Sequence, residues 1–117
     1  MSITKIIILS FEGTAEFKQH ETNLDTLQGL VGGYIESISL PDADPCDWAA
    51  FCNEEGKLVD LPGNERATTL LYLLGGHNPQ DLIRGDVILV GINEQGETVD
   101  VPDTLIELVR TIMPVAP

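Results

Sequence analysis

Residues 53–62 read NEEGKLVDLP, and residues 93–102 repeat the pattern as NEQGETVDVP. Asparagine, glutamate, glycine, valine, aspartate and proline occupy the same places in both copies. Asparagine at the first position of a turn and glycine at the fourth favour a type I turn, and a left-handed glycine suits a hairpin with a bulge. The repeat therefore predicts two β-hairpins, each ended by its proline and each followed by a helix.

Outside the repeat, the pattern of apolar residues switches between strand and helix periods. Residues 3–11 are apolar and β-branched, which is typical of a buried central strand, and residues 15–20 alternate as a half-buried return strand. Further strands are expected at 34–40, 57–61, 86–92 and 97–101. Residues 47–52 fit either a strand or a short helical turn, and residues 79–83 fit one helical turn.

Three helices are predicted from leucine-rich segments with side chains at helical spacing. The first helix begins at Leu24, the second covers residues 65–74 and the third covers residues 104–113. The expected caps are Asn23, Asn64 and Asp103, in the same order. The chain then consists of three hairpin-plus-helix units, with one additional strand between the first and the second. We expect an α+β fold: a single two-layer domain over residues 1–117, with the helices on one side of a mostly antiparallel sheet. Chance similarity of two common turns remains an alternative to duplication.

The charge balance limits the classes of partner. The chain of 117 residues has 19 acidic and 6 basic residues, a formal net charge of -13. A nucleic-acid-binding protein needs a basic surface that displaces counterions, so direct binding to nucleic acid is not expected. A basic protein surface and a small ligand held by a few local cations remain, beside the simpler interpretation that the charge only keeps the protein soluble.

The two cysteines, Cys46 and Cys52, are too few for a disulfide framework, and no cysteine and histidine spacing predicts a zinc site. No metal or cofactor is therefore expected. The apolar run near the start is too short for a signal or a membrane span. These features predict a cytoplasmic protein that does not contact a membrane.

The most suggestive chemistry lies where the first repeat enters its helix. Gly63 and Asn64 precede a helix whose first turn carries Arg66 and Thr68, and Arg84 is a further cation. Free backbone N–H groups and the helix dipole favour an anion at such a place, and a guanidinium can grip a phosphate or carboxylate. The alternative is an ordinary capped helix with a solvated first turn.

Support for catalysis is poor. Most carboxylates lie in predicted turns, so choosing two of them as acid and base would be arbitrary. His20 and His77 have no recognisable nucleophile or metal partner in the sequence. We therefore do not expect an enzyme.

Four segments stand out by their order along the chain, at residues 30–36, 53–58, 62–68 and 85–91. Together they resemble the short phage- and plasmid-borne proteins grouped as domain of unknown function 3846, and the resemblance covers about residues 27–100. It implies a small accessory protein of a phage, a mobile element or its bacterial host. It implies no catalytic residues, and it does not cover the start of the chain up to Glu21 or the helix after Pro102.

We therefore expect a non-catalytic binding protein of a phage or mobile element, acting in the cytoplasm of a bacterial host, with counter-defence as one role. Its expected ligand is a small anionic, nucleotide-like molecule at residues 63–69, held by Gly63, Asn64, Arg66, Thr68 and Arg84. The alternative is an acidic protein-interaction module, or a nucleic-acid mimic, that blocks a basic host protein. A homo-oligomer is a further expectation, based on the frequency of closed dimers.

Overall fold

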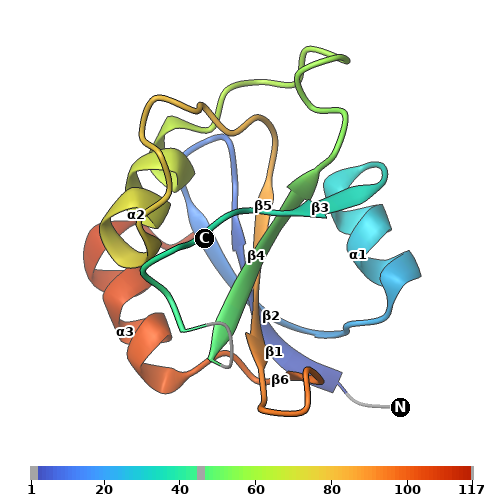
Figure 1. Cartoon of the computed structure of the whole chain (residues 1–117), viewed down its shortest axis with the longest axis vertical. Coiled ribbons are helices and arrows are strands. Elements are labelled where there is room, and N and C mark those ends of the chain that lie inside the picture. The colour runs from blue at the N-terminus through green and yellow to red at the C-terminus, as the bar shows by residue number, and fades with distance from the viewer. Residues whose placement is uncertain (1–2, 45–46, 117) are drawn as a thin grey trace.

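Strands and helices follow one another as three strand–strand–helix units in the computed structural model, which describes residues 3–44 and 47–116 (Figure 1). The first unit is β1 (Ile3–Leu9), β2 (Ala15–Glu21) and α1 (Leu24–Val31). The second is β3 (Ile35–Ser37), β4 (Trp48–Asn53) and α2 (Glu65–Gly75). The third is β5 (Val87–Ile92), β6 (Thr98–Val99) and α3 (Asp103–Ile112).

The strands form one six-stranded sheet in which every strand pair is antiparallel. The order is β2-β1-β5-β4-β3, and β6 pairs with the end of β5. On one side of β5, β1 pairs with residues 87–89 and β6 with residues 91–92. The expected α+β class, with three helices and a mostly antiparallel sheet, is confirmed.

The helices cover both faces of the sheet, so the expectation that all of them lie on one side is wrong for α1 (Figure 1). Helices α2 and α3 pack on the face that carries Ile7 and Leu89. Helix α1 packs with Leu27 and Val31 on the opposite face, against Ile88. The physical reason lies in the central strands, whose residues are apolar and buried on both faces and therefore need a cover on each. The domain thus has three layers.

The second unit is built differently from its prediction. Its hairpin consists of β3 and β4, with Ile35 opposite Asn53, so the strand expected as an additional one is the hairpin's first strand. The strand predicted at 57–61 does not form, and residues 54–60 are turns. Strand β4 has β5 on one side and β3 on the other, so the chain that leaves it finds no free edge. Of the two alternatives for residues 47–52, the strand is confirmed.

The two copies of the repeat have the same turn at their asparagine, and their backbone conformations differ from the glycine onward. In both, the asparagine carbonyl accepts a bond from the glycine N–H, and the asparagine side chain accepts one from the backbone two residues on. Gly96 has φ 79° and continues into β6, as the hairpin prediction requires. Gly56 is not among the described glycines with positive φ, and the chain coils there, with Leu61 N–H donating to its carbonyl. The predicted hairpin is therefore confirmed for the second copy and wrong for the first.

Two of the three predicted helix caps are confirmed. Side chains of Asn23 and Asn64 accept backbone N–H bonds at the starts of α1 and α2. The cap predicted at Asp103 is wrong, because α3 begins at Asp103 itself and Pro102 holds the preceding position without a side-chain bond. Residues 79–83 form no helical turn; the chain there makes only a turn in which Asp81 N–H donates to the Asn78 carbonyl.

Candidate functional site

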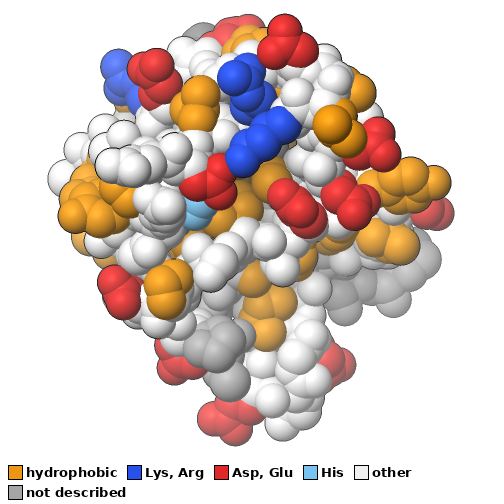
Figure 2. Space-filling view, turned by 45° about the horizontal axis from the view of Figure 1, so that its top comes forward, with side chains coloured by type: hydrophobic (Ala, Val, Ile, Leu, Met, Phe, Trp, Pro, Cys, Tyr) orange, Lys and Arg blue, Asp and Glu red, His pale blue; other side chains and the backbone are white. Residues whose placement is uncertain are grey.

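A cleft of about 390 Å³ opens at the end of the sheet where β4 ends. Its walls are β3 with the residues after it, the turn that follows β4, and residues 76–78 and 81–84 beyond α2. Figure 2 brings this end forward and shows basic side chains beside acidic ones, with a histidine next to one of the acidic side chains. The volume falls within the range of ~300–1,000 Å³ that is typical of small-molecule sites.

Two cations line the cleft, and each is held by a carboxylate. Arg84 Nη1 donates to Asp60 at 3.4 Å and to the Leu61 carbonyl at 3.1 Å. Lys57 forms an ion pair with Asp81, whose hydrogen bond and charge raise the pKa of the lysine. A guanidinium has five N–H donors. Within the described residues, Nε and the Nη2 group of Arg84 make no hydrogen bond and remain available to a ligand.

Glu36 and Cys52 face one another across the β3–β4 pair at the cleft wall. Cys52 Sγ lies 3.9 Å from Glu36 Oε1. Burial raises the pKa of the Cys52 thiol to about 11, and the neighbouring Glu36 carboxylate adds to the rise. A nucleophilic cysteine needs the opposite environment, one that stabilises the thiolate. Cys52 is therefore suited to packing rather than to attack on a substrate.

Neutral polar groups complete the lining. Ser37 at the end of β3 and Ser39 after it are exposed and belong to one wall. His77 is only 5% exposed, and its Nε2 lies 2.9 Å from the carbonyl oxygen of Asp81. A carbonyl oxygen only accepts hydrogen bonds, so Nε2 carries the proton and donates. The histidine thus fixes the chain beyond α2 as the wall opposite the serines.

Asn64 and Thr68, two of the five predicted ligand residues, are buried and fully engaged inside the protein. Asn64 Nδ2 donates to the carbonyls of Leu9 and Gly85, both at 2.9 Å, and its Oδ1 accepts from Ala67 N–H. Thr68 Oγ1 donates to the Asn64 carbonyl and accepts from Ile83 N–H. The structure gives both side chains a role in holding α2 to the sheet and to the segment before β5.

The other three predicted residues lie at two different places. Gly63 forms an isolated antiparallel bridge with Arg84, but a Cβ on Gly63 would lie 2.9 Å from Leu82, so this glycine faces a wall rather than a ligand. Arg66 is exposed and lies against the turn between β1 and β2, where a Cβ on Gly13 would come within 3.0 Å of its Cδ. Of the five residues, only Arg84 lines the cleft.

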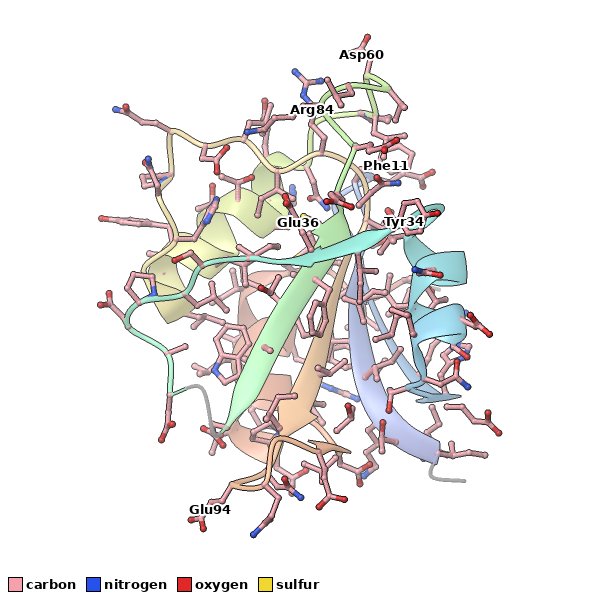
Figure 3. All side chains as sticks on the ribbon, turned by 45° about the vertical axis from the view of Figure 1, so that its right-hand side comes forward. Phe11, Tyr34, Glu36, Asp60, Arg84 and Glu94 are labelled. Atoms are coloured by element: carbon pink, nitrogen blue, oxygen red, sulfur yellow. The ribbon has the colours of Figure 1, made fainter. Side chains whose placement is uncertain are left out.

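The sequence did not predict the remaining cleft residues as site residues. Glu36, Lys57 and Asp81 come from a strand, a turn and a loop that only the folded sheet brings together. The one available signal in the sequence was the turn after residue 53. Because no hairpin forms there, Lys57 is not part of a strand and its side chain reaches Asp81 in another loop. Figure 3 shows Glu36 and Arg84 at the same end of the sheet, with Asp60 beyond Arg84 at the tip of the turns.

In the part of the chain that the structure describes, no three histidine, cysteine, aspartate or glutamate side chains come together as a metal site. Cys46 lies outside the described residues. Within residues 3–44 and 47–116, the helices are too short or too polar to cross a membrane.

A family model described as "Domain of unknown function (DUF3846)" matches residues 3–113. The match is wider than the resemblance seen in the sequence, since it takes in β1, β2 and α3. Neither the curated proteins nor the solved structures contain a match. The family model covers nearly the whole chain, so the protein belongs to the DUF3846 family.

Proposed function

We propose that the protein is a non-catalytic binding protein whose ligand is a small anionic, nucleotide-like molecule. The proposed site is the cleft at the end of β4, in place of the helix start at residues 63–69. The observation that carries the proposal is Arg84, which is one of the residues that line the cleft and whose Nε and Nη2 make no hydrogen bond within the described residues. A guanidinium with two neighbouring donors free binds a phosphate or carboxylate through paired hydrogen bonds.

The charges of the cleft suit a ligand with two kinds of group. Arg84 and Lys57 lie on one side and would hold the anionic group. Glu36 lies on the β3 wall, where its carboxylate would accept hydrogen bonds from the ligand's N–H or O–H donors. A nucleotide has both kinds of group, a phosphate and a base.

Binding without catalysis is supported by the state of the reactive side chains. Cys52 has a raised pKa, and His77 has its Nε2–H bonded to a carbonyl. General acid–base or nucleophilic catalysis needs a base or a nucleophile that is free to react, and these environments favour neither. We further propose, from the resemblance to phage- and plasmid-borne proteins, that the ligand is a signal of a bacterial host and that the protein sequesters it in the cytoplasm.

Isothermal titration with inorganic phosphate, mononucleotides and cyclic dinucleotides tests the proposal. We expect heat from at least one nucleotide, and affinity about tenfold or more weaker in Arg84→Gln, because the substitution removes a charge-assisted pair of bonds. Arg66→Gln is the matched control, since this exposed arginine lies outside the cleft. The thermal midpoint of each variant shows whether the fold is retained.

The controls separate two ways of being wrong. A loss of affinity in Arg66→Gln but not in Arg84→Gln would return the site to the start of α2. Titrations without heat for any phosphate-bearing compound would refute small-ligand binding altogether.

A further inference from the structure

A second concave surface lies beside the cleft, between the end of α1 and the turns that follow β4. It has a volume of about 400 Å³ and is lined by Gln28, Gly32, Gly33, Tyr34, Asn53, Glu55 and Val59. We call it the Tyr34 groove. The two concave surfaces share Asn53 in their lining and lie on either side of the turns at residues 54–60.

The Tyr34 groove is held in shape by bonds that cross it. Asn53 Nδ2 donates to the Val31 carbonyl at 3.1 Å, and Glu54 N–H donates to the Tyr34 carbonyl at 2.8 Å. A Cβ on Gly33 would lie 2.9 Å from Asn53 Nδ2, so the glycine lets the two walls approach closely. The groove is therefore a formed feature of the fold.

Large apolar side chains are exposed at the Tyr34 groove. Tyr34 is 65% exposed, Val59 is 56% exposed, and the neighbouring Leu58 is 85% exposed. Leaving such side chains in water forgoes the gain of their burial, and grouped apolar side chains on a surface mark an interaction site. A single exposed leucine would carry no such meaning, but three lie on or next to one groove.

Charge indicates what kind of partner covers the groove. Glu55 lines the groove, and the side chain of Asp60, the residue after Val59, is 91% exposed. With a net charge of -13, a second copy of this chain would be repelled, whereas a basic segment would be attracted.

We propose that the Tyr34 groove docks a basic segment of another protein, which inserts one apolar side chain between Tyr34 and Val59 and sets a lysine or arginine against Glu55. This interaction surface is separate from the nucleotide-like ligand of the cleft. Apolar burial provides the affinity, and the carboxylates select a basic partner.

The test uses a synthetic peptide of lysines and glycines around one central leucine, and the same peptide with serine in place of leucine. Fluorescence anisotropy measures binding, and backbone amide NMR shifts locate it. We expect the leucine peptide to bind about tenfold more tightly than the serine peptide, because it buries an apolar side chain. The amide shifts should concentrate in residues 32–34 and 53–60.

The repeat supplies a matched control for the charge. Glu55→Gln should weaken binding of the leucine peptide, and the turn tolerates the change because the second copy has Gln95 at the equivalent position. Glu94→Gln changes the charge equally at the opposite end of the sheet (Figure 3) and should leave binding unchanged. Val59→Ser should weaken binding about tenfold, whereas Leu73→Ser, an equally exposed position on α2, should not.

Three results would overturn the proposal. Equal binding of the two peptides would mean capture by charge alone. Amide shifts spread over the acidic surface, or an equal loss in the two control variants, would mean that the groove is not the site. A dimer in sedimentation that Val59→Ser dissociates would show that a second copy occupies the groove. None of these outcomes bears on titration of the cleft with nucleotides.

Discussion

Asn64 is the residue that ties the three parts of the structure together. Its side chain is fully buried, and it joins the end of β1, the start of α2 and the segment before β5. The sequence showed a helix cap here, and this is correct. The two bonds made by Nδ2 could not be predicted, because their acceptors Leu9 and Gly85 are remote in the chain.

Replacing Asn64 by alanine should therefore cost far more than the loss of an ordinary cap. The substitution leaves the buried carbonyls of Leu9 and Gly85 without their donor, and we expect the free energy of unfolding to fall by about 3 kcal/mol. Asn23→Ala, at the exposed cap of α1, is the control and should cost about 1 kcal/mol. Urea unfolding curves measure both. Equal losses would show that Asn64 acts only as a cap.

Because of Cys52, the free energy of unfolding should fall as the pH rises in the alkaline range. Burial, together with Glu36, raises the pKa of its thiol from 9.0 to about 11. The unfolded chain releases this proton at a lower pH than the folded chain does, so the thiol's contribution to stability is complete below pH 9 and is lost as the pH rises to about 11.

The prediction is tested in a Cys46→Ser background, which leaves Cys52 as the only cysteine. Urea unfolding across this pH range should show a steeper fall of stability than in the variant that also carries Cys52→Ala. The difference between the two variants removes the contribution of other groups that titrate there. Parallel pH profiles would contradict the raised pKa.

At the scale of elements, the repeat shows where local sequence stops deciding structure. Both copies make the same asparagine bonds, so the turn was predictable. Beyond the turn, a strand forms only where the sheet has a free edge: β1 pairs with β5 only as far as Leu89, which leaves room for β6, whereas β4 is flanked on both sides. The local sign of this difference was small: the second copy has the β-branched Thr98 where the first has Leu58, and the valine that follows is the same in both.

In the candidate site, too, local features were predictable from the sequence and long-range ones were not. The start of α2 was recognisable, because capping is local, and so its residues were proposed as a site. The cleft is formed by a turn without a hairpin and by loops from separate units, whose meeting depends on the order of strands in the sheet. Of the predicted residues, Arg84 alone lines the cleft, because its position is set by the bridge to Gly63.

Gly91 in β5 tests how tightly the third unit is joined to the sheet. It pairs with Trp48 on one side and with Val99 on the other, and a Cβ there would overlap the main chain of Asp100. Backbone cannot move aside as a flexible side chain does, so Gly91→Ala should lower the free energy of unfolding by about 3 kcal/mol.

The control for this substitution is Gly29→Ala in α1. Gly29 is exposed, and an added Cβ would meet no atom within 4 Å. Alanine favours a helix over glycine, so this change should raise stability by up to about 1 kcal/mol. Thermal and urea unfolding compare the two variants. A neutral Gly91→Ala would mean that β6 detaches from the sheet at little cost.

At the scale of the whole molecule, the apolar strands favour a compact fold, whereas the net charge opposes it. The continuous apolar runs of β1 and β5 required cover on both faces, and three layers result from them. The charge of -13 does not influence the fold, but it opposes compactness. Ion pairs such as Lys18–Glu16, Lys57–Asp81 and Arg84–Asp60 each have at least one partner more than half exposed, so they offset little of this charge. The excess of negative charge is therefore expected to be mutually repulsive.

Salt should consequently stabilise this protein. Sodium chloride at about 0.1 M screens charges beyond roughly 10 Å, and we expect the thermal midpoint to rise by roughly 3–5 °C relative to low salt. Replacing the exposed Glu12, Glu94 and Glu107 by glutamine brings the net charge from -13 to -10, since three negative charges are removed from the 19 acidic and 6 basic residues. This triple variant should melt higher at low salt and gain less from added salt, which scanning calorimetry measures. An unchanged gain in the triple variant would contradict charge repulsion and indicate specific binding of chloride instead.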